Sequence, residues 1–126
     1  MLKDLALATF LSFAPLTAFA HGAPPAAAHG GQVAEDSAEH WVEIVIGGDQ
    51  LRVYVLDEDK HPIPSAQLGG KATVLIGGKS QNVPLTAGDG NSLVGSLSAP
   101  AAGKTTTVLS LTVSGKPAQV RFTTSQ

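Results

Sequence analysis

The chain has 126 residues, contains no cysteine and carries a formal net charge of −2 at pH 7. This length suits a single domain, which can bury a sufficient core without disulfides. The lack of cysteine excludes a lipoprotein anchor, a disulfide framework and any thiolate metal or nucleophile site. A small net charge of mixed sign argues against nucleic acid as a partner, because nucleic-acid binding needs a basic footprint.

The first 20 residues have the features of an export signal. Lys3 supplies positive charge, residues 5–13 are largely apolar, and Ala18 and Ala20 are the small residues that a signal peptidase inspects. The apolar run is shorter than the roughly 20 residues of a membrane span. We therefore expect cleavage after Ala20, a periplasmic protein that begins at His21, and no stable membrane anchor after cleavage.

Residues 21–39 are dominated by Ala, Gly and Pro and contain almost no large apolar side chain. The Pro24-Pro25 pair favours extended geometry, and the Gly30-Gly31 pair favours flexibility. This composition predicts a flexible arm over residues 21–39, followed by a β-domain over residues 40–126.

The first strong strand signals lie in residues 41–46 and 51–56, where apolar and other side chains alternate with a period of two. Gly47, Gly48 and Asp49 separate the two runs and suit a tight reversal, so a β-hairpin is expected. The remaining strands are expected at residues 71–76, 81–85, 92–98, 104–113 and 116–124.

Seven short strands with frequent turn signals and no helical stripe predict an all-β fold. The expected architecture is an antiparallel, immunoglobulin-like β-sandwich of about seven strands. A small barrel is the alternative. Trp41, Tyr54 and Phe122 are the expected large residues of the core or of a sheet face.

Histidines supply the candidate chemistry, since neutral imidazole is a common ligand of Cu and Zn. If His21 is the mature N-terminus, its α-amino and ring nitrogens can chelate one metal together, with His29 or His40 adding a third nitrogen. Such a set suits Cu(II) or, with less preference, Zn(II). The spacing of these residues matches no compact ligand motif, and an ordinary disordered arm is the competing interpretation.

Other candidates carry weaker signals. Asp57, Glu58 and Asp59 lack the ligand spacing of an EF-hand and are interpreted as a solvated turn, with His61 as a loop residue. The chain has neither a G-x-S-x-G motif nor a recognisable arrangement of nucleophile and base, so we expect no enzymatic activity.

The order of motifs resembles a small periplasmic β-domain. It runs from HGG at residues 29–31 through HWVEIVIGGDQLRVYVLDEDKHPIP, KATVLIGG and VPLTAGDGNSLVGSL to AQVRF at residues 118–122. Similar domains occur alone and as N-terminal additions on periplasmic adaptor subunits of heavy-metal efflux pumps of the resistance-nodulation-division class. A looser resemblance is to small, cysteine-free periplasmic copper carriers.

The resemblance implies a periplasmic accessory role connected with copper, zinc or related cations, and an envelope or efflux-pump protein as partner. We therefore expect a non-enzymatic protein that binds Cu(II) or Zn(II) through His21, His29 and His40. The alternative is a structural or protein-interaction module of the cell envelope, which binds through a sheet edge and has no metal role.

Overall fold

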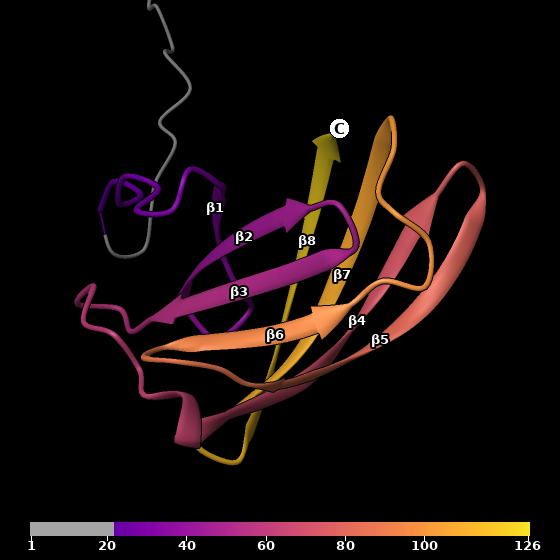
Figure 1. Ribbon diagram of the computed structural model, residues 1–126. Coiled ribbons are helices and arrows are strands. Elements are labelled where there is room, and N and C mark those ends of the chain that lie inside the picture. The colour runs from indigo at the N-terminus through magenta and orange to yellow at the C-terminus, as the bar shows by residue number, and fades with distance from the viewer. Residues whose placement is uncertain (1–21) are drawn as a thin grey trace, which may run out of the picture.

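The computed structural model describes residues 22–126, so His21 and the predicted signal peptide lie outside the described residues. The described chain is built of strands, as predicted, and the all-β class is confirmed (Figure 1). Within residues 22–126, no helix is long and apolar enough to cross a membrane. The elements are β1 (Gln32–Glu35), β2 (Trp41–Gly47), β3 (Gln50–Leu56), the 3-10 helix η1 (Ser65–Gln67), β4 (Leu68–Ile76), β5 (Lys79–Ala87), β6 (Ser92–Ser96), β7 (Lys104–Val113) and β8 (Lys116–Ser125).

The eight strands form one antiparallel sheet in the order β1-β2-β3-β6-β5-β4-β7-β8. The sheet curls until its end strands, β1 and β8, approach each other, which gives a nearly closed barrel (Figure 1). Strand β5 joins the two halves, because it pairs with β4 over residues 79–85 and with β6 only through Thr86 and Ala87. The two separate sheets of an immunoglobulin-like sandwich are not confirmed, and the architecture is closer to the alternative, a small barrel.

Alternation of side chains along the strands fills the barrel. One face of each long strand points inward, and apolar residues two positions apart in β2, β3, β7 and β8 share the core. Most of the core is aliphatic, and Phe122 is its one aromatic residue among those described. The largest fully buried side chains of the core are those of Ile44, Leu51, Leu93 and Leu109.

The predicted hairpin is present as β2 and β3. Gly47 pairs with Gln50, which leaves Gly48 and Asp49 as a two-residue turn. Gly48 has a φ of 58°, a conformation that a glycine adopts without strain. This hairpin carries the site described below on its outer face.

Strand β1 differs from the sequence prediction, because it lies within the range that was predicted as a flexible arm. Its four residues pair with β2, from Gln32 opposite Ile44 to Glu35 opposite Trp41. Gly31 allows this close approach, since a Cβ atom there would lie 2.1 Å from the carbonyl oxygen of Ile44. The β-domain of the structure therefore extends N-terminally to Gln32.

Candidate functional site

The outer face of the β2–β3 hairpin carries a second cluster of side chains, separate from the core. Trp41 lies opposite Leu56, and Glu43 lies opposite Tyr54, so these four residues share the face that points away from the barrel interior. Trp41 is only 1% exposed although it is not part of the core cluster. Something other than the barrel must therefore cover it.

Residues 25–31, which we name the cover segment, lie over this face. Pro25 and His29 of the cover segment line a cavity of about 50 Å³ together with Trp41 and Tyr54 of the sheet. The imidazole of His29 stacks on the ring of Tyr54, with centroids 3.6 Å apart and an angle of 4° between the planes. The cover segment is thus held to the barrel by a specific aromatic contact.

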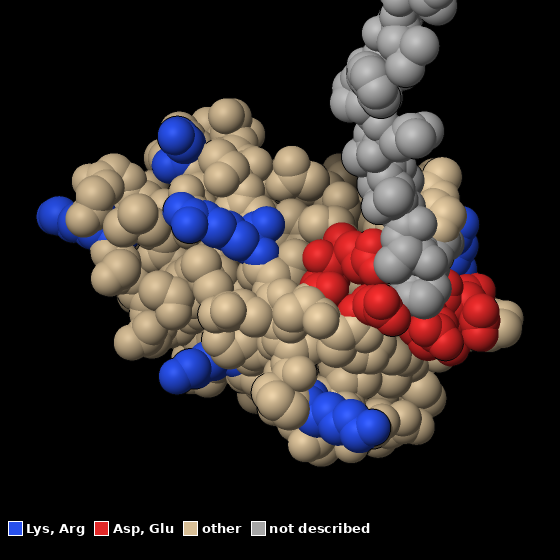
Figure 2. Space-filling model, turned by 180° about the vertical axis from the view of Figure 1, so that it is seen from behind, with Lys and Arg blue, Asp and Glu red and all other residues tan. Residues whose placement is uncertain are grey.

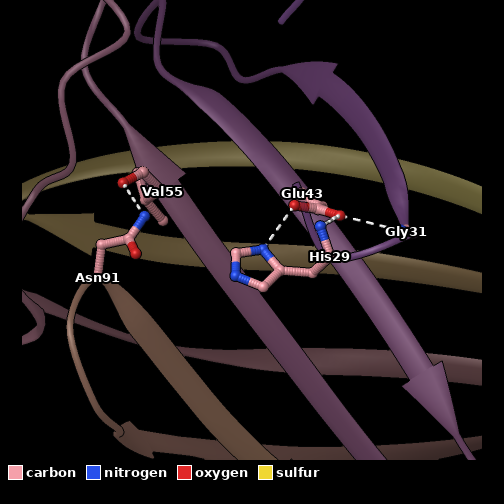
Figure 3. A network of polar contacts seen from close by, with 5 residues as sticks. All are labelled: His29, Gly31, Glu43, Val55 and Asn91. Atoms are coloured by element: carbon pink, nitrogen blue, oxygen red, sulfur yellow. Dashed lines mark hydrogen bonds and ion pairs between the residues drawn. The ribbon is translucent and has the colours of Figure 1, made fainter. Parts of the chain in front are cut away.

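Glu43 provides the polar anchor of the cover segment (Figure 3). Its Oε2 accepts hydrogen bonds from the backbone N–H groups of His29 and Gly31, at 3.0 and 2.9 Å. Its Oε1 lies 2.9 Å from Nδ1 of His29. The carboxylate therefore holds both the backbone and the ring of the histidine, and Nε2 is the ring nitrogen that Glu43 leaves unused.

The environment of Glu43 favours its charged form. Burial raises the pKa of the carboxyl group, but hydrogen bonds from the His29 side chain and from the backbone N–H groups of Gly31 and His29 outweigh it. The pKa of Glu43 is consequently below its ordinary value of 4.5. An ionised carboxylate only accepts hydrogen bonds, so the proton in its contact with His29 resides on Nδ1.

His40 makes a similar contact in a different setting. Its Nδ1 lies 2.8 Å from Oδ2 of Asp36, whose side chain is fully buried. Oδ1 of Asp36 accepts from the backbone N–H groups of Ala38 and His40, both at 2.9 Å. The neighbouring Ser37 exchanges hydrogen bonds with Gln119 of β8. This histidine belongs to the loop that fastens β1 and β2 to β8.

A third histidine lies in the turn after β3. Asp57, Asp59 and His61 bring one ligand atom each to within 4.8 Å of one another, and among residues 22–126 they are the group of three with this property. All three are at least partly exposed, and Oδ1 of Asp57 accepts from the backbone N–H groups of Asp59 and His61. This is the solvated turn of the sequence interpretation, closed by its own hydrogen bonds.

Of the predicted ligands, the structure describes His29 and His40 but not His21. His29 and His40 belong to no group of three metal-ligating side chains within the described residues, and His21 lies outside them. Sequence reasoning missed Glu43 and Tyr54 as partners of His29. A signal was present, because Glu43 is the one charged residue in the apolar run 41–46.

The acidic side chains in view gather at one end of the molecule, where one basic side chain lies beside them, and the other Lys and Arg side chains are spread over the remainder of this face (Figure 2). The β1–β2 loop holds Asp36 and Glu39, and the turn after β3 holds Asp57, Glu58 and Asp59. Pairing of Trp41 with Leu56 places the two segments at the same end of the hairpin. Lys60 lies in the same turn as Asp57, Glu58 and Asp59, and Asp36 is buried against His40, so the charges at this end are of mixed sign.

A scan against protein-family models finds no match to the chain, and a search of curated proteins finds no relative.

Proposed function

We propose that the protein is a non-enzymatic, periplasmic accessory protein that binds Cu(II) or Zn(II) through histidines of its N-terminal segment, in metal homeostasis or efflux. One observation carries the proposal: Nδ1 of His29 lies 2.9 Å from a carboxylate that is itself fixed by two backbone N–H groups. Histidines that ligate metals almost always use their second ring nitrogen in this way. Nε2 of His29 then has the lone pair that a metal needs when the ring is neutral.

The surroundings of His29 support this role. Its side chain is 42% exposed, so a metal ion can reach the ring from solvent. His21 stands eight positions before His29 in the sequence. Eight fully extended residues span at most about 28 Å, which is therefore the greatest distance possible between the two histidines. We propose that the amino group and ring of His21 complete the ligand set with His29. The geometry gives no support to His40 as a third ligand, because its side chain is 18% exposed and fastens a loop.

The test is calorimetric titration of the mature protein, beginning at His21, with Cu(II) and with Zn(II) at neutral pH. Two variants accompany it: His29→Ala, and a version with one extra residue before His21. One-to-one binding that both changes weaken supports the proposal. Equal, weak binding in all three proteins would refute it.

A second candidate function is an envelope interaction module, favoured by the open edge of β8. The backbone groups of Gln119 turn toward Ser37 and away from β7, so those of Arg121, Thr123 and Ser125 share this direction by the period of two. A groove of about 440 Å³ separates this end of β8 from β1 and β2. A strand of an efflux-pump or envelope partner would fit there.

If this second function is correct, a partner protein is recovered together with the wild-type protein even when a chelator is present. The same partner is not recovered with the Thr123→Pro variant. Proline removes a backbone N–H that points into the groove, while the ladder to β7 uses the alternate residues. Recovery that depends on metal, or that survives Thr123→Pro, would contradict strand addition at this edge.

A further inference from the structure

We propose, on the basis of the metal-binding role of His29 above, that Glu43 is the positioning residue that makes this histidine a metal ligand. It does so by fixing the imidazole proton on Nδ1 and by holding the ring against the barrel wall. Docking of the cover segment then precedes metal binding and strengthens it. The ligand His29 is held on the folded barrel by these contacts.

The two oxygens of Glu43 have separate tasks. Oε2 accepts from the backbone N–H groups of His29 and Gly31, which fixes the path of the cover segment. Oε1 faces the ring, 2.9 Å from Nδ1 of His29. Because the carboxylate is only an acceptor, it selects the tautomer with the proton on Nδ1 and leaves Nε2 with its lone pair.

Tyr54 fixes the remaining freedom of the ring. The stacked contact, with planes 4° from parallel, sets the orientation of the imidazole around its bond to the chain. The direction of Nε2 is therefore determined before a metal ion arrives. Preorganisation of this kind reduces the ordering that binding must otherwise impose. A carboxylate in the outer shell of a histidine ligand typically changes metal affinity by about 10–100-fold.

The division of tasks makes Glu43→Gln a specific test. If the glutamine oxygen replaces Oε2, both backbone hydrogen bonds persist and the cover segment stays docked. The amide NH2 then replaces Oε1 and faces Nδ1 of His29. Since NH2 is a donor, Nδ1 must become the acceptor, and the proton moves to Nε2. The substitution thus removes the lone pair from the proposed ligand atom while it preserves the contacts of the backbone.

The experiment combines two measurements on the mature protein that begins at His21. Nitrogen-15 NMR of the metal-free protein assigns the tautomer of His29, and calorimetry gives the affinity for Zn(II) alone. Fluorescence of Trp41, the only tryptophan in the chain, reports whether the cover segment remains docked. The variants are Glu43→Gln, Tyr54→Leu and His29→Ala, with Glu35→Gln as the matched control that removes the same charge from neighbouring β1.

In the Glu43→Gln variant, we expect His29 to carry its proton on Nε2. We also expect this variant to bind Zn(II) about 10–100-fold more weakly than the wild type does. In the Tyr54→Leu variant, His29 should keep its proton on Nδ1, and the loss of Zn(II) affinity should be smaller than in Glu43→Gln. The Glu35→Gln control should bind Zn(II) as the wild type does. Wild-type affinity in Glu43→Gln would overturn the role of Glu43. So would an equal loss in Tyr54→Leu with an unchanged tautomer, since docking alone would then explain the effect. Wild-type affinity in His29→Ala would instead refute the proposed function itself.

Discussion

The contacts of His29 with Glu43 and of His40 with Asp36 use the same atoms, Nδ1 and a carboxylate oxygen, at 2.9 and 2.8 Å. His40 and Asp36 are four residues apart and close a loop, whereas His29 and Glu43 are 14 residues apart and join the cover segment to the sheet. His40 is largely buried, and His29 is 42% exposed. A histidine–carboxylate pair is therefore structural or available for binding according to what it connects and how far its ring reaches solvent.

The largest effect on folding should come from Asp36→Ala. The buried carboxylate of Asp36 accepts from the backbone N–H groups of Ala38 and His40 and from the ring of His40. Loss of this acceptor removes three part-buried hydrogen bonds at once, and we expect the free energy of unfolding to fall by about 3 kcal/mol. Urea denaturation measures the change, with exposed Asp49→Ala as the control. A loss below about 1 kcal/mol would mean that the loop does not depend on this network.

The two histidines should respond in opposite ways to alanine substitution. His29→Ala should lower the affinity for Zn(II) at least about tenfold, which is about 1.4 kcal/mol, with a small effect on unfolding. His40→Ala should leave the affinity unchanged and lower the free energy of unfolding by about 1 kcal/mol, because it removes a contact of buried Asp36. Calorimetry and urea denaturation on both variants separate the effects. A loss of affinity in His40→Ala would remove the distinction between the two pairs.

Docking of the cover segment should depend on pH through Glu43. The pKa of Glu43 is lower in the folded protein than its ordinary value of 4.5. The stabilisation from its charged form is therefore fully present above that value and is lost as the pH falls through the lower, folded pKa. NMR signals of the His29 and Gly31 amides should report this local release in the wild type and show no such step in Glu43→Gln. Docking that survives complete protonation of Glu43 would contradict the anchoring role of the carboxylate.

The smallest effect is predicted in the barrel core, where neither histidine pair takes part. Thr107 is fully buried, and its Oγ1 has no hydrogen-bond partner in the described structure. Thr107→Val keeps the β-branched shape and removes the unpaired hydroxyl, so we expect a gain of about 1 kcal/mol in the free energy of unfolding. Zn(II) affinity should not change. Destabilisation in thermal or urea unfolding would show that the hydroxyl is satisfied in solution.

The strands that form the barrel were readily predicted from the sequence because they depend on local alternation. The period of two in residues 41–46 and 51–56, with glycines between them, determines both the hairpin and its inner face. The closure of the sheet was not predictable in the same way. The number of sheets depends on how β5 bends between β4 and β6, and only two residues of β5, Thr86 and Ala87, pair with β6.

The site was less predictable, because its parts meet through tertiary contacts. His29 was identified as a candidate ligand from its residue type alone. Its partner Glu43 lies on β2, and its stacking partner Tyr54 lies on β3. Strand β1 was missed because four residues, QVAE, show no clear alternation and form a strand only by pairing with β2. The approach of Gly31 to Ile44 that permits this pairing has no local signature beyond the glycine itself.

The most direct test of the account is nitrogen-15 NMR of the histidine rings during titration of the mature protein with Zn(II). The account predicts that Nε2 of His29 shifts on coordination while Nδ1 keeps its proton and its hydrogen bond to Glu43, and that the ring of His40 stays unchanged. A saturating titration in which the ring of His29 does not respond, or in which His40 responds in its place, would contradict it.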